Sequence, residues 1–171
     1  RMCSKKFLNF SLMNMCTWVV MKWKSQLEEM SSLSETDSYG ELGSVEELQA
    51  WLVRDMEKFF LANGKKLIGW DEVVSDGLSS DAAITWWRSW AKDALPTATA
   101  QKQKVIACPN EYFYFDYAQD QSSVKKILAY DPCADERLSP EQKKYIWGVQ
   151  ANLWAEWIPT MKCIEYLIVP V

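Results

Sequence analysis

Hydrophobic and polar positions along this chain fall into blocks that predict a helix followed by short buried strands. Apolar residues recur at helical spacing over 48–60, after a capping-box pattern at 44–47 and before an Asn63-Gly64 stop. We expect a helix here whose apolar stripe packs in the core. The stripe consists of Leu48, Trp51, Leu52, Met56, Phe59 and Phe60.

Short apolar runs then alternate with helix-like segments. Strands are expected at 66–70, 82–87, 104–108 and 147–154, with helices over 89–95, from Ser139-Pro140 onward, and from Thr160 onward. Continuous apolar strands separated by helices are typical of parallel βα units. The predicted fold class is therefore α/β, and sites in such folds lie at the carboxyl ends of the strands.

Composition narrows the classes of function. The 171 residues carry a net charge of −4 and no histidine, so the commonest general base and metal ligand is missing. No basic stripe indicates a nucleic-acid partner, and the apolar-rich run at 7–21 is too short and too polar to predict a membrane span or a normal signal peptide. Five cysteines without a CxxC motif predict neither a zinc site nor a complete disulfide framework, and nothing calls for a cofactor.

Tryptophan and acidic residues gather where the predicted strands end. The chain has ten tryptophans, which serve equally well in cores and as sugar platforms. The most informative segment is 147–157, read as a strand that ends in Trp154-Ala155-Glu156 and presents an indole and a carboxylate on one side. Two other strands end in Trp70-Asp71-Glu72 and Trp87-Arg88. A flat apolar plate beside hydrogen-bonding groups favours a carbohydrate site.

Together these segments resemble glycoside hydrolase family 20, the β-N-acetylhexosaminidases. The matching stretches appear in family order and cover about 45–170: KKLIGWDE (65–72), ITWWRSW (84–90), 114–116, 130–132, GVQANLWAEWIPT (148–160) and 165–167. The resemblance implies part of a (β/α)8 TIM barrel, roughly strands four or five to eight, with residues 7–17 standing at strand four. It also implies hydrolysis of terminal N-acetylglucosamine or N-acetylgalactosamine by a substrate-assisted retaining mechanism.

The same resemblance implies roles for six residues. Trp70, Trp87 and Trp154 match the indoles that enclose the acetamido methyl and the sugar face. Tyr114 matches the tyrosine whose hydroxyl bonds the acetamido oxygen, and Asp116 and Glu156 match the carboxylates that hold sugar hydroxyls. We interpret Arg88 as structural, an ion-pair partner of a carboxylate at a neighbouring strand end.

The family's catalytic His-x-Gly-Gly-Asp-Glu motif is missing from the sequence. Counting back from Trp23, the positions of the Asp-Glu pair fall on Cys16 and Thr17, neither of which can act as a tuned carboxylic acid. The first-strand arginine, strands one to three and the arginine usual near residue 171 are also missing. The 171-residue chain is therefore expected to be inactive alone, with a non-catalytic N-acetylhexosamine-binding or interaction module as the alternative function.

The chain divides into an irregular N-terminal segment, 1–44, and a C-terminal half-barrel, 45–171. Back-translated with permitted codons and read two bases later, 16–24 gives His-Leu-Gly-Gly-Asp-Glu-Val-Glu. We therefore interpret the segment before about residue 25 as an out-of-frame remnant of strand four and its loop.

Several features have plainer explanations. Asp71 and Glu72 are a tempting substitute for the catalytic pair, but neighbouring strand residues point to opposite faces, so only one could enter a site. Trp51, Trp90, Trp147 and Trp157 are expected to pack in the interior. A half-barrel leaves open strand edges, which self-association or another chain would cover. Family analogy suggests a lysosomal or secreted location, although no signal peptide is evident.

Overall fold

The computed structural model describes residues 15–17, 45–117 and 124–168. The side chains of 15–17, 45, 46 and 157 lie outside that description. The elements are, in chain order, β1 (Met15–Thr17), α2 (Val45–Ala62), β2 (Lys66–Trp70), the 3₁₀ helix η2 (Asp71–Ser75), β3 (Ala83–Trp86), α3 (Ala94–Ala100), β4 (Lys104–Ala107), α4 (Asn110–Phe113), α5 (Val124–Ala129), the 3₁₀ helix η3 (Gln142–Tyr145), β5 (Ile146–Val149), the 3₁₀ helix η4 (Ala155–Trp157) and α6 (Met161–Ile168).

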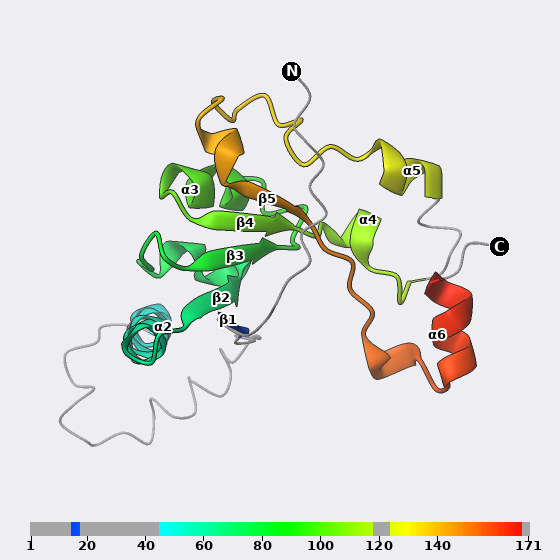
Figure 1. Ribbon diagram of the computed structural model, residues 1–171, viewed down its shortest axis with the longest axis horizontal. Coiled ribbons are helices and arrows are strands. Elements are labelled where there is room, and N and C mark those ends of the chain that lie inside the picture. Colours follow the sequence, from blue (N-terminus) through cyan, green and yellow to red (C-terminus); the bar gives the residue numbers. More distant parts are fainter. Residues whose placement is uncertain (1–14, 18–44, 118–123, 169–171) are drawn as a thin grey trace.

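The five strands form one parallel sheet in the order β1-β2-β3-β4-β5, which confirms the predicted α/β class. All strands run the same way, and α4, α5 and α6 lie beyond their carboxyl ends (Figure 1). Strand β1 occupies the place expected for barrel strand four, pairing Thr17 with Ile68 of β2. Of the predicted span 7–17, residues 7–14 lie outside the described part. No helix within the described ranges is long and apolar enough to cross a membrane.

The main core lies between the sheet and the helices that precede its strands. Its centre is formed by fully buried side chains of β3 and β4, such as Ile84 and Val105, against Val53 of α2, all 0% exposed. At Gly69 in β2 an added Cβ would come within 2.6 Å of Val73 Cγ2, so only glycine allows η2 to fold back on the strand. This packing fixes the strand ends relative to one another.

Helix α2 is confirmed, including its stop at Gly64 (φ 68°), but only part of the predicted stripe faces the core, where Phe60 packs against the buried cluster. Phe59 and Trp51 are 59% and 39% exposed, whereas Glu57 is buried at 6%. The Glu57 carboxylate accepts hydrogen bonds from Ser79 N (3.1 Å) and Ser79 Oγ (2.7 Å). A buried carboxylate must keep its hydrogen-bond donors, so the contact with Ser79 decides which face of the helix is turned to the interior. The number of apolar residues on a face does not decide it.

Two further boundaries differ from the prediction. The helix expected at 89–95 is instead α3, because Pro96 fits the first helical turn while the preceding residues form tight turns. Strand β5 ends at Val149 and not at 154, because Val149 pairs with Ala107, the last residue of β4. A bulge and Gly148 (φ 152°) lie inside the strand.

The last helix begins after Thr160 as predicted, whereas the helix predicted from Ser139-Pro140 begins at Gln142 as the 3₁₀ helix η3. Helices α4 and α5 were not expected. Ser139 and Gln142 form a reciprocal capping pair before η3, with Gln142 N to Ser139 Oγ at 3.2 Å and Ser139 N to Gln142 Oε1 at 3.1 Å. Thr160 Oγ1 accepts a hydrogen bond from Cys163 N at 3.3 Å and caps α6. Helix α5 has no buried residue, so it offers little periodic signal.

Candidate functional site

Four aromatic rings from four neighbouring strand ends meet at the carboxyl edge of the sheet. Trp70 closes β2, Trp87 follows β3, Tyr114 follows β4 and α4, and Trp154 lies beyond β5. The Trp70 ring centroid lies 5.9 Å from that of Trp154 and 6.5 Å from that of Trp87. Trp87 and Tyr114 are stacked with centroids 5.9 Å apart. The sequence prediction that these strand ends share one mouth is confirmed at the level of position.

Backbone pairing past β4 and β5 holds two of these rings in place. Tyr114 and Asn152 form a parallel bridge, with Phe115 N to Asn152 O at 2.9 Å and Asn152 N to Phe113 O at 2.7 Å. The sheet therefore continues as a single ladder step beyond its last regular residues. That step places Tyr114 and Trp154, two residues after Asn152, at the mouth.

Burial raises the pKa of the Tyr114 hydroxyl well above its ordinary value of 10.0. The nearby Cys108 thiol adds to this effect, while a side-chain hydrogen bond with Trp154 opposes it. The hydroxyl therefore keeps its proton at neutral pH. A protonated phenol is a hydrogen-bond donor, which is the state that a carbonyl oxygen requires.

The two carboxylates directly after β2, Asp71 and Glu72, both bind residues at the end of β3. Asp71 is 2% exposed and accepts a hydrogen bond and ion pair from Arg88 Nε at 3.1 Å. Glu72 accepts from Trp87 Nε1 with both carboxylate oxygens, at 3.1 and 3.2 Å. The structural role predicted for Arg88 is confirmed. The expectation that Asp71 and Glu72 point to opposite faces is wrong, because they belong to a 3₁₀ helix and not to a strand.

Burial raises the pKa of Asp71 from 3.8 to about 6, against the lowering effect of Arg88. Loss of water around the carboxylate is the larger cause, and the neighbouring Glu72 charge raises the pKa further. At neutral pH Asp71 is still charged and needs its guanidinium partner. The protonation state of Asp71 therefore affects the stability of the protein.

Three buried polar atoms in this region have no hydrogen-bond partner among the described residues. They are the donors Trp70 Nε1 and Asn152 Nδ2 and the carboxylate acceptor Asp116 Oδ1. Leaving a buried donor or acceptor unpaired costs about 1–3 kcal/mol. A water, an ion or a ligand can satisfy such atoms.

Glu156 differs from the prediction for its segment. It lies in the 3₁₀ helix η4 and is exposed, whereas Trp154 precedes η4 in extended conformation and is half-buried. The argument that Trp154 and Glu156 share one face of a strand is therefore wrong, because β5 ends five residues before Trp154. The binding role of Glu156 stays a prediction.

Sequence reasoning missed the contacts that support the rings. The fully buried Cys108 thiol lies near the Asn152 side chain, and burial raises its pKa to about 12. Gln150 Nε2 in turn donates to Asn152 Oδ1 at 2.7 Å. In the sequence, the QAN tripeptide at 150–152 interrupts an apolar run with polar residues. This interruption was the available signal for the supporting contacts.

Residues 19–170 match the family described as glycosyl hydrolase family 20, catalytic domain. This chain belongs to glycoside hydrolase family 20. The family match begins at residue 19, whereas the sequence stretches that resemble the family begin at about residue 45. The chain is also 32% identical over 136 residues to a β-hexosaminidase of Porphyromonas gingivalis and 29% identical over 137 residues to one of Vibrio furnissii, in each case over 72% of this chain.

Solved structures agree on the fold of this family 20 chain. A family 20 exo-β-N-acetylglucosaminidase from Vibrio harveyi, solved in complex with N-acetylglucosamine, matches 86% of this chain and 28% of its own at a TM-score of 0.65 and 24% identity. A β-N-acetylhexosaminidase of 17% identity matches 91% of this chain and 35% of its own at a TM-score of 0.78. The described sheet is thus part of a TIM barrel. The chain spans 17% and 22% of the length of the two curated relatives.

Proposed function

We propose that these residues form the C-terminal part of an N-acetylhexosamine site in a β-N-acetylhexosaminidase catalytic domain. The observation that supports this most directly is the convergence of Trp70, Trp87, Tyr114 and Trp154 at one mouth. The indoles would enclose the acetamido methyl and one sugar face. Asp116 and Glu156 would accept hydrogen bonds from sugar hydroxyls, and the unpaired Asp116 oxygen favours this role.

The proposed chemistry uses the substrate's own acetamido oxygen as nucleophile on the anomeric carbon. The protonated Tyr114 hydroxyl would donate to that oxygen and hold it in position for attack on the anomeric carbon. General acid catalysis would fall to a carboxylic acid at the end of barrel strand four. The sequence holds Cys16 and Thr17 there, in β1. Asp71 and Glu72 do not replace it, since both bind β3 residues.

The 171-residue chain would therefore bind its sugar without hydrolysing it, because general acid–base catalysis is commonly worth 10²–10⁴-fold. A sugar-binding module is the second candidate, favoured by the unpaired Trp70 donor and Asp116 acceptor. Both candidates predict recognition of N-acetylhexosamine-terminated glycans. The out-of-frame origin of the segment before about residue 25 stays a hypothesis, which sequencing of the transcript tests.

Titration of the chain with N-acetylglucosamine, followed by tryptophan fluorescence, tests the proposal. We expect a saturable change with N-acetylglucosamine and a much weaker one with glucose, which lacks the acetamido group. A chromogenic N-acetylglucosaminide should stay uncleaved in the same samples. Equal responses to both sugars, or none to either, would contradict the site; turnover abolished by Glu156→Ala would contradict the inactivity.

A further inference from the structure

Trp87 is attached to the protein through its single hydrogen-bond donor. Glu72 accepts from Trp87 Nε1 with both carboxylate oxygens, at 3.1 and 3.2 Å. An indole carries one N–H donor and no acceptor. Because Glu72 binds that donor, Trp87 presents only carbon atoms to the strand-end mouth.

Neighbouring rings determine the plane of the Trp87 ring but not which edge its N–H occupies. Tyr114 stacks on Trp87 with centroids 5.9 Å apart, and Trp90 meets it edge to face at 5.2 Å. Trp90 itself is 61% exposed, so the sequence prediction that it packs in the interior is wrong. Carbon atoms on either edge of an indole can make such ring contacts. The hydrogen bond to Glu72 is therefore the contact that decides where the N–H points.

Trp70, the indole opposite Trp87, has its donor in the contrary state. The two ring centroids are 6.5 Å apart, with the ring planes at 83°. Trp70 Nε1 is buried and has no hydrogen-bond partner among the described residues. The two indoles therefore offer a ligand different surfaces: Trp70 offers a hydrogen-bond donor, and Trp87 offers an apolar wall.

Asp71 binds the other groups near Trp87, which leaves Glu72 for the indole. Arg88 Nε lies 3.1 Å from Asp71 Oδ2 but 4.0 Å from Glu72 Oε1. Trp87 N also donates to Asp71 Oδ1, at 3.5 Å. The guanidinium and the Trp87 backbone are thus bound by Asp71, and the Trp87 ring by Glu72.

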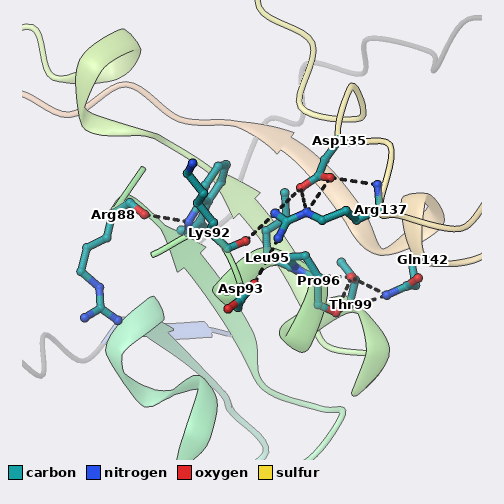
Figure 2. A network of polar contacts seen from close by, with 10 residues as sticks. Arg88, Lys92, Asp93, Leu95, Pro96, Thr99, Asp135, Arg137 and Gln142 are labelled. Carbon is teal, nitrogen blue, oxygen red and sulfur yellow. Dashed lines mark hydrogen bonds and ion pairs between the residues drawn. The ribbon is translucent and has the colours of Figure 1, made fainter. Parts of the chain in front are cut away.

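The chain that follows Trp87 is held by contacts that do not involve Glu72. Arg137 Nη2 donates to Lys92 O at 2.6 Å, and Arg137 Nη1 pairs with Asp93 Oδ1 at 3.1 Å (Figure 2). Loss of the Glu72 carboxylate should therefore change the direction of the Trp87 N–H and leave the course of the backbone intact.

We propose that Glu72 is a positioning residue that keeps the Trp87 wall apolar by binding its donor, so that the site selects amino sugars with an apolar N-acyl group. The inference rests on the proposed function, which places the acyl group among these indoles. A hydroxyl against the Trp87 wall would lose its water and find no donor there, and an unpaired buried polar group lowers affinity. A methyl group in the same place loses nothing.

Calorimetric titration with two N-acylglucosamines of equal size tests this selection. N-propionylglucosamine and N-glycolylglucosamine differ only by a methyl group in place of a hydroxyl, so size cannot separate them. Wild-type chain should bind the N-propionyl sugar roughly tenfold more tightly. In Glu72→Leu the Trp87 N–H has no acceptor on η2 and turns toward the ligand, so the ratio of affinities should fall to about threefold or less.

Further variants separate the hydrogen bond from the charge and from the fold. Glu72→Gln keeps the side-chain length and an acceptor oxygen, and should keep most of the wild-type ratio. Glu72→Asp stays charged but is shorter, so it should lose the ratio, and it replaces Glu72→Leu if that variant does not fold. The Trp87 indole N–H signal in the ¹⁵N–¹H NMR spectrum, recorded without sugar, should move in Glu72→Leu and Glu72→Asp and stay near its wild-type position in Glu72→Gln.

Glu57→Gln is the matched control. The Glu57 carboxylate also accepts hydrogen bonds, from Ser79 N and Oγ, but Ser79 precedes β3 whereas Trp87 follows it. Changing Glu57 should leave the ratio of affinities for the two sugars unchanged.

The outcomes separate the two proposals. An unchanged ratio in Glu72→Leu, or in Glu72→Asp where it replaces that variant, would overturn the selection and leave the proposed function standing. Equal affinities in the wild-type chain would do the same, because the hydroxyl would then have found a donor. So would binding of N-acetylglucosamine without either larger sugar, because size would then decide. If the wild-type chain binds none of these sugars, both proposals fall.

Discussion

Arg88→Met should lower the free energy of unfolding at pH 7 by about 3 kcal/mol, because it leaves the buried Asp71 carboxylate without a cationic partner. The Asp71 side chain is 0% exposed and Arg88 only 27%, so water cannot replace the lost guanidinium. The same change frees the end of β3 that carries Trp87. Urea unfolding followed by tryptophan fluorescence measures the loss.

The loss should shrink at pH 5, because Asp71 can then be neutral. Burial raises its pKa to about 6, above the ordinary 3.8, so the folded protein holds this proton more tightly than the unfolded chain does. The stability contributed by this proton is therefore fully present below about pH 4 and is lost as the pH rises through about 6. A protonated Asp71 needs no cation opposite it.

Lys66→Met is the matched control for this prediction. Lys66 Nζ pairs with Asp81 Oδ1 at 2.6 Å, closer than Arg88 to Asp71, but the two side chains are 54% and 53% exposed. A solvated pair of this kind contributes about 0–1 kcal/mol. Equal losses in the two variants, or a pH-independent loss in Arg88→Met, would show that burial does not decide the strength of the pair.

Trp70→Ala should cost about 3–5 kcal/mol and abolish N-acetylglucosamine binding. Trp70 is 8% exposed and packs against both Trp87 and Trp154, so its removal leaves a cavity between the other two indoles. Chemical unfolding and sugar titration measure the two effects separately. If Trp70→Ala does not fold, Trp70→Phe is the variant that tests the role of Trp70 in sugar binding.

Trp70→Phe keeps an aromatic ring in the core but removes the unpaired Nε1 donor. We expect it to stay folded and to bind sugar more weakly, since the donor would no longer meet a ligand oxygen. Trp51→Ala, a tryptophan that is 39% exposed on α2, is the matched control and should keep sugar affinity. Wild-type affinity in Trp70→Phe and Trp70→Ala would place the sugar elsewhere.

The sheet and the meeting of its strand ends were predictable from short-range patterns. Apolar runs such as 66–70 and 104–107 read as buried strands, and parallel strands bring their carboxyl ends to one edge. Once that edge is known, Trp70, Trp87, Tyr114 and Trp154 must lie close together. The partner of Arg88 followed from the same reasoning, since the nearest buried acid sits at the neighbouring strand end.

Details that depend on tertiary contacts were not predictable. The rotation of α2 is decided by the hydrogen bonds between Glu57 and Ser79, which a count of apolar residues does not contain. Glu72 reaches the Trp87 indole only because the chain turns into η2 directly after β2. Strand periodicity likewise failed at Glu156, because β5 ends at Val149, where its partner β4 also ends.

The central claim is that the indoles at the carboxyl edge of the sheet form an acetamido-sugar site. Its most direct test is the indole N–H region of the ¹⁵N–¹H NMR spectrum during a titration with N-acetylglucosamine, with each signal assigned by single Trp→Phe variants. We predict that the Trp70, Trp87 and Trp154 signals shift together and saturate, while Trp51 stays still and glucose moves none of them. Signals of these three tryptophans that stay still with N-acetylglucosamine, or that respond equally to glucose, would contradict the claim.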